Sequence, residues 1–119
     1  MGIKHLPRLI TEFGIGSSLR RQDYTQAAVR AVKDAPWHNS INLAELYGQD
    51  KQQMQITLEV GVQQPDQIDK AELAAIFPYG QVTVLARRGG LDVPRGDGGN
   101  PTVIANVAIS VALEPEPKA

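Results

Sequence analysis

A short segment rich in glycine, serine and arginine is the part of the sequence best suited to hold a charged ligand. It reads Phe-Gly-Ile-Gly-Ser-Ser-Leu-Arg-Arg-Gln-Asp over residues 13–23. Glycines in a turn before a helix can expose backbone N–H groups to an anion, and a helix N-terminus adds partial positive charge. Hydroxyl and guanidinium groups donate further hydrogen bonds to carboxylate or phosphate. The candidate ligand-binding residues are Gly14, Gly16, Ser17, Ser18, Arg20 and Arg21.

Two interpretations of this segment stay open. The third glycine of a dinucleotide-binding fingerprint is missing, and there is no Gly-Lys-Ser/Thr phosphate loop. The segment can equally be a glycine turn whose arginines are solvated. A small anionic ligand is therefore a prediction from residue type and position, and no cofactor is implied.

Two further residues are candidates for acid–base catalysis. His38 follows the only tryptophan, and an imidazole can exchange a proton near neutral pH. Glu12 directly precedes the glycine segment and can act as a base or balance a nearby arginine. Each also has a purely structural interpretation, as a hydrogen-bonding histidine and a paired carboxylate. With no cysteine and two histidines far apart, no metal site is expected.

Periodicity and capping predict the elements that position these residues. A short strand is expected over residues 8–13, stopped by the two glycines. Asp23 and Gln26 form a capping box that opens a helix, and Pro36 ends that helix. Its inward face is mostly alanine, so it can approach a sheet closely.

The remaining elements alternate strands with short helices. Asn42 is expected to cap a short helix that Gly48 ends, and Asp69 with Glu72 opens another over residues 69–77. Alternation of apolar and polar residues predicts strands over 53–62, 81–88 and 102–113. The connection over residues 89–101 holds five glycines and two prolines. It is either a lid over a ligand or a disordered loop.

This order predicts an α+β two-layer sandwich, with a four-stranded, mostly antiparallel sheet and two main helices on one face. A ferredoxin-like and a chorismate-mutase-like arrangement both fit. The second face of the last strand is mostly small and uncharged: Ile104, Asn106, Ala108, Ser110 and Ala112. Such a face is either buried within one chain or covered by another copy, and a chain of 119 residues has few further layers. A homo-oligomer is therefore expected.

Composition limits the classes of function. Twelve basic and 13 acidic side chains give a net charge of -1, which argues against a nucleic-acid partner. No apolar run reaches the roughly 20 residues of a membrane helix, and no secretory signal is recognisable, so a cytoplasmic protein with no membrane partner is expected. One domain over residues 1–113 and a flexible tail over 114–119 account for the chain.

The glycine segment also resembles a motif. Together with residues 22–40 and Phe77-Pro78-Tyr79-Gly80, it is similar to a family of small uncharacterised bacterial proteins marked by Gly-x-Gly-x-Asp-x-His-Gly. Gly14 and Gly16 match that motif, whereas Ser18 stands at the Asp position, Arg20 at the His position and Arg21 at the last Gly. The resemblance runs from about Leu9 to Val111 and implies no activity.

Two functions follow as hypotheses. The first is an oligomeric protein or enzyme that binds a small anionic metabolite near subunit interfaces. The second is a structural or interaction subunit without catalysis.

Overall fold

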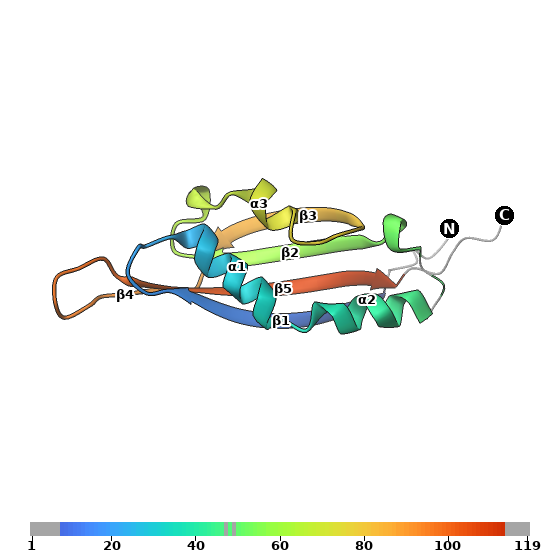
Figure 1. The fold of residues 1–119 in the computed structure, drawn as a ribbon, viewed down its shortest axis with the longest axis horizontal. Coiled ribbons are helices and arrows are strands. Elements are labelled where there is room, and N and C mark those ends of the chain that lie inside the picture. Colours follow the sequence, from blue (N-terminus) through green and yellow to red (C-terminus); the bar gives the residue numbers. More distant parts are fainter. Residues whose placement is uncertain (1–7, 47, 49, 114–119) are drawn as a thin grey trace, which may run out of the picture.

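The computed structural model describes residues 8–46, 48 and 50–113. Its strands are β1 (Arg8–Ser18), β2 (Gln55–Val62), β3 (Gln81–Arg88), β4 (Leu91–Val93) and β5 (Thr102–Leu113). Its α-helices are α1 (Tyr24–Asp34), α2 (Trp37–Leu46) and α3 (Lys70–Ala74), with 3-10 turns at Lys51–Gln53 and Pro65–Gln67. The strands form one sheet in the order β1-β5-β2-β3, and β4 pairs with the start of β5 (Figure 1). Only β2 and β3 pair in parallel.

The strand β1 differs most from its prediction. It does not stop at the glycines but continues to Ser18, with Gly14 opposite Val107 and Gly16 opposite Ala105 in the β1–β5 ladder. The expected glycine turn is therefore wrong. A Cβ atom built on Gly14 would lie 2.1 Å from the backbone oxygen of Ala31. The glycines are needed because α1 packs directly on the backbone of β1.

The first helix matches its prediction, whereas the second does not. The Asp23 carboxylate caps α1 by accepting a hydrogen bond from the Gln26 backbone N–H at 2.9 Å. The short helix predicted from Asn42 is wrong, because α2 already begins at Trp37. Pro36 therefore lies between two helices, ending α1 and preceding the first turn of α2, where its missing N–H does no harm. The helix expected over 69–77 is shorter, Lys70–Ala74, although Asp69 caps it as predicted.

The glycine-rich connection contains a strand that the sequence analysis missed. Leu91–Val93 pairs antiparallel with residues 102–104 of β5. Part of the connection is thus an extension of the sheet, at the end of the molecule where β1 passes into α1 (Figure 1).

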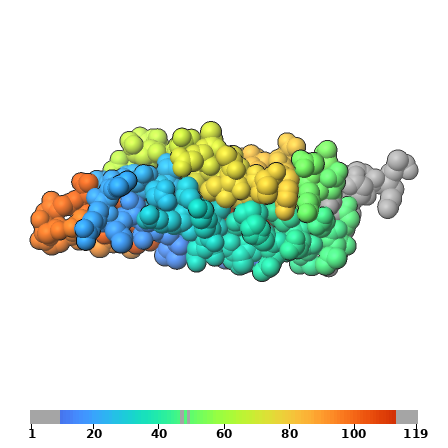
Figure 2. All heavy atoms as spheres, in the orientation of Figure 1, coloured from blue at the N-terminus to red at the C-terminus, as the bar shows by residue number. Residues whose placement is uncertain are grey.

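The helices form a layer on one face of the sheet, and Figure 2 shows them at the front of the molecule. The core lies between this layer and the sheet. The predicted inward face of β5 is buried: Val103, Ala105, Val107, Ile109 and Val111. The shortest dimension of the molecule is 20 Å, the thickness of one helix layer on one sheet. No helix in the described part of the chain covers the other face of the sheet, on which Asn106 is exposed and Ile104, Ala108, Ser110 and Ala112 are half-buried.

The fold class is α+β, with a mixed five-stranded sheet and three helices. The prediction of four strands lacked β4, and the prediction of a mostly antiparallel sheet holds for three of the four strand pairings. The tail predicted over 114–119 lies outside the described residues. None of the helices described is long and apolar enough to cross a membrane.

Candidate functional site

Three arginines line one pocket at the end of the molecule where β1 passes into α1. The pocket has a volume of about 550 Å³, and we call it the arginine pocket. It is lined by Ser18, Leu19, Arg20, Arg21, Asp23, Gln26 and Arg30. The structure thus brings together Ser18, Arg20 and Arg21, three of the six candidate ligand-binding residues.

Arg30 is a pocket residue that sequence reasoning missed. It projects from the second turn of α1, and its guanidinium donates to the Ser17 carbonyl at 2.7 Å. The spacing of positions 23, 26 and 30 could have indicated that Arg30 lies beside the glycine segment, because these positions share one face of a helix. Ser17 contributes this carbonyl to the edge of β1 and does not line the pocket.

Hydrogen bonds hold the turn below the arginines in a defined conformation. The buried Ser18 hydroxyl accepts from the Asp23 backbone N–H at 3.2 Å. The Leu19 and Arg20 carbonyls accept from Thr102 at 3.2 Å and from Asn100 at 3.3 Å. Gln22 adopts a φ of 51°, in the left-handed region that costs a residue other than glycine about 1 kcal/mol or more. The turn is therefore specified by its contacts with the 94–102 segment and with α1.

The pocket carries an excess of positive charge. It contains three guanidinium groups and one carboxylate, that of Asp23. The ion pairs found among the described residues, Lys51–Glu45, Arg87–Glu59 and Arg95–Asp97, involve none of these arginines. The Asp23 carboxylate already accepts the Gln26 N–H, and the cationic donors of the pocket are the three arginine side chains. Planar guanidinium groups suit carboxylate and phosphate oxygens.

The two glycines do not form the expected cradle. Gly14 and Gly16 lie inside β1, on the face that contacts α1, and neither lines the arginine pocket. Their sequence pattern is explained by helix packing, which places α1 and therefore Arg30.

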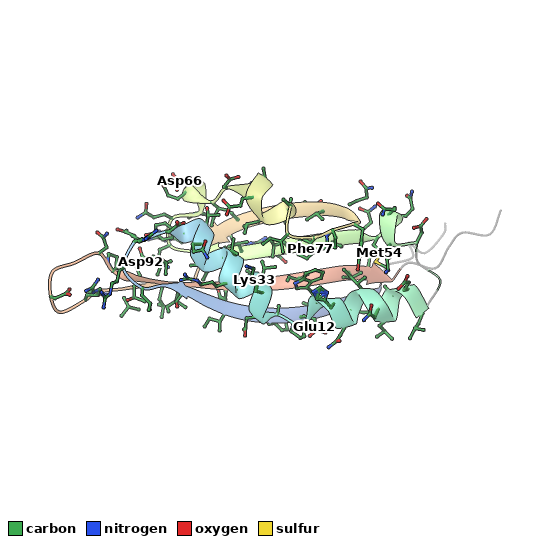
Figure 3. All side chains as sticks on the ribbon, viewed as in Figure 1. Glu12, Lys33, Met54, Asp66, Phe77 and Asp92 are labelled. Carbon is green, nitrogen blue, oxygen red and sulfur yellow. The ribbon has the colours of Figure 1, made fainter. Side chains whose placement is uncertain are left out.

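The acid–base candidates lie elsewhere. The Glu12 carboxylate accepts from the buried Ser40 hydroxyl of α2 at 3.2 Å, and the exposed His38 ring stacks on Trp37 at 3.8 Å between centroids. Ser18 lies six positions after Glu12 in the extended strand β1, a distance of roughly 20 Å at about 3.3 Å per residue. Figure 3 shows Glu12 beside α2, far from β4 along the long axis. The structure therefore does not bring Glu12 or His38 to the arginines.

A buried polar cluster joins the start of α1 to β4. The Tyr24 hydroxyl donates to Asp92 Oδ2 at 2.5 Å and accepts from the Gln22 and Gln64 side-chain amides, each at 3.0 Å. Burial, followed by the hydrogen bond to Asp92, raises the pKa of the Tyr24 hydroxyl above its ordinary value. The other oxygen of Asp92 is buried without a partner. Asp92, labelled in Figure 3, thereby ties β4 to the turn that carries the arginines.

The site holds no evident metal centre. Among residues 8–46, 48 and 50–113 there is no group of three or more His, Cys, Asp and Glu side chains that could hold a metal ion.

Comparisons with known proteins identify relatives but no activity. The model of a family described as conserved hypothetical proteins, the Lin0512 family, matches residues 8–111. The crystal structure of an FtsZ-like protein of unknown function from Nostoc punctiforme is similar, with 31% sequence identity and a TM-score of 0.79. The match covers 91% of this chain and 97% of that one. No curated protein matches the chain. Since the family model spans most of its length, the chain belongs to the Lin0512 family of conserved hypothetical proteins.

Proposed function

We propose that this chain binds a small polyanionic metabolite, with carboxylate or phosphate groups, in the arginine pocket. The observation that carries the proposal is the convergence of Arg20, Arg21 and Arg30 on one pocket that contains a single carboxylate. Three guanidinium groups can engage two or more anionic groups of one ligand. The pocket volume is within the range of small-molecule sites, about 300–1,000 Å³.

Binding is favoured over catalysis as the role of this pocket. A general acid or base must come within hydrogen-bond reach of the reacting atom. Glu12 and His38 are the two candidates, and the contacts of Glu12 with α2 set that part of the molecule about 20 Å from the arginines. The polar groups beside the arginines are a serine, a glutamine and the capping Asp23, which already holds the helix N-terminus.

A panel of anions in a thermal-shift assay tests the proposal. We would compare citrate, pyrophosphate and a nucleoside triphosphate with chloride at equal ionic strength. A ligand at 100 times its Kd stabilises the folded state by about 2.7 kcal/mol, which raises Tm on the order of 10 °C in a domain of this size. The double variant Arg20→Gln with Arg21→Gln is expected to abolish the rise, and Arg30→Gln to reduce it.

The chain offers a matched control for the loss of charge. Arg87 and Arg88 form a second arginine pair outside the arginine pocket, so Arg87→Gln with Arg88→Gln changes the net charge equally. This control should keep the full response. Failure of every anion to raise Tm, or an equal loss in the control, would refute the proposal.

A non-catalytic interaction subunit is the second candidate function. The uncovered face of the sheet favours it, because large apolar side chains such as Phe13 and Leu91 are exposed there.

A further inference from the structure

The face of the sheet turned away from the helices carries several large, exposed apolar side chains, and we call it the open sheet face. Its most exposed apolar side chains are Phe13, Ile15, Leu85, Leu91 and Val93. Phe13 exposes 70% of its surface, and Leu91 exposes 60%. The strand register sets these residues on one side, because Phe13 lies opposite Ala108, and Leu91 and Ser17 both lie opposite Ile104. Exposed apolar side chains gathered on one face of a sheet mark interaction sites.

A groove lies beside Phe13 on this face. It has a volume of about 380 Å³, and its lining includes Gly61, Ala108 and the ion pair between Glu59 and Arg87. Gly61 and Ala108 are small, so the middle of the sheet is hollow where Phe13 protrudes at its side. An apolar cavity of about 150 Å³ suffices for a benzene molecule, so this groove can accept a phenyl ring.

We propose that the open sheet face is the surface on which a second copy of this chain docks. In a two-fold arrangement the Phe13 ring of each copy enters the groove of the other, and the symmetry axis passes close to Ala108. A protrusion beside a hollow is the shape that an isologous contact requires. Small side chains along β5 let the two sheets approach closely.

Charge favours a second copy over other occupants. Glu59 and Arg87, the charged residues that the register places on this face beside the groove, pair at 2.9 Å. Arg88 also lines the groove, but the register places it beside the buried Val62, on the helix side of β3. Two such faces meet without repulsion between like charges. A nucleic acid or an anionic membrane would instead be expected to select a basic surface.

Side chains of α1 already bind two backbone groups at one end of the β1 edge. The Asp34 carboxylate accepts from the Ile15 backbone N–H at 3.0 Å, and Arg30 donates to the Ser17 carbonyl. Side chains from α1 thus occupy backbone groups that another strand would need. At this end of β1, association through the face is favoured over extension of the sheet.

The face is large enough for a specific interface. Four strands with about eight residues each span roughly 19 Å by 26 Å, on the order of 500 Å² in projection. Protruding side chains and β4 enlarge the accessible area toward the roughly 800 Å² per partner of standard interfaces.

The first test is the mass in solution. Sedimentation velocity of the full chain, over about 1 to 100 μM, should give a species of about twice the 12.9 kDa chain mass. Phe13→Asp is expected to shift this species to 12.9 kDa, and Leu46→Asp on α2, a residue 82% exposed, is the matched control that should still associate. A monomeric wild-type chain at every concentration overturns the proposal, and so does a Phe13→Asp variant that associates normally.

A cross-link tests the geometry even where Phe13→Asp fails to fold. The chain has no cysteine, so Ala108→Cys introduces a single thiol close to the proposed axis. Under mild oxidation it should form a disulfide-linked dimer, whereas Leu46→Cys should not. Equal cross-linking of the two variants, or none at Ala108→Cys, contradicts the proposed docking.

Discussion

Replacing Gly16 by alanine should loosen the packing that places Arg30. A Cβ atom at this position would lie 2.3 Å from the Ala31 nitrogen and 2.5 Å from the Ala27 oxygen. Both are backbone atoms of α1, so no change of side-chain rotamer relieves the contact. Ordinary contact begins near 3.4 Å, so the helix must retreat by about 1 Å from the strand.

The loss of stability in Gly16→Ala comes from the contacts that weaken when α1 moves away from β1. Ala27 and Ala31 are fully buried between α1 and the sheet, and a gap of 0.5–1 Å forfeits roughly a quarter to a half of the dispersion energy of each contact. Overpacking of this kind costs about 1–3 kcal/mol, and occasionally more. The lower entropy of the unfolded alanine variant returns about 0.4–1 kcal/mol. We therefore expect the free energy of unfolding to fall by about 1–2 kcal/mol.

Urea denaturation followed by circular dichroism measures this change. With a slope of about 1–3 kcal/mol per molar urea, the midpoint should fall by about 1 M. Gly96→Ala is the matched control, because no atom lies within 4 Å of a Cβ at that position, and its effect should stay within about 0.5 kcal/mol. If Gly16→Ala is as stable as Gly96→Ala, α1 does not pack directly on the backbone of β1.

Two further predictions concern the surroundings of the arginine pocket. Tyr24→Phe should destabilise the protein by about 1–3 kcal/mol at neutral pH, because it leaves Asp92 without its hydroxyl donor. The pKa of Tyr24 is raised in the folded state, so its hydroxyl favours folding below pH 10 and loses that contribution as the pH rises further. Urea denaturation should show that the difference in unfolding free energy between wild type and Tyr24→Phe is smaller above pH 10 than at pH 7. A larger difference above pH 10 contradicts the hydrogen bond from Tyr24 to Asp92. Asp23→Asn keeps a helix-capping oxygen but removes the one carboxylate of the pocket, so calorimetry should show anion affinity rising about two- to fivefold. A weaker affinity would mean that Asp23 helps to bind the ligand.

Elements with strong local signals were predicted well. The boundaries of β3 and β5 were found from alternation alone, since each strand keeps one apolar face throughout. The start of α1 was found because Asp23 caps it through a contact only three residues away. Such signals depend on neighbours in sequence, which a single sequence contains.

Elements that depend on contacts between residues far apart in the sequence were not predicted well. Glycine permits both a turn and a close approach of backbones, and only the packing of α1 on Gly14 and Gly16 decides between them. The strand β4 has three residues, too few for a pattern, and is held by its pairing with β5. Pro36 was recognised as the end of one helix, but its position before another helix depends on how α2 packs on the sheet.

The candidate site was predicted in part for the same reason. Ser18, Arg20 and Arg21 are neighbours in the sequence, so they remained neighbours in the structure. Arg30 reaches them because one turn of chain folds α1 back along β1. The strand β1 continues through Gly14 and Gly16 because α1 packs on them, and this length keeps Glu12 away from the arginines. Neighbouring residues in the sequence do not reveal that packing.

The most direct test of anion binding is a titration with pyrophosphate followed by nuclear magnetic resonance of the ¹⁵N-labelled protein. We predict saturable shifts in the backbone amides of residues 18–23 and 26 and in the side-chain N–H signals of Arg20, Arg21 and Arg30. The signals of Arg87 and Arg88 should stay in place. Shifts spread over all arginines, or none at the pocket, would contradict a specific anion site.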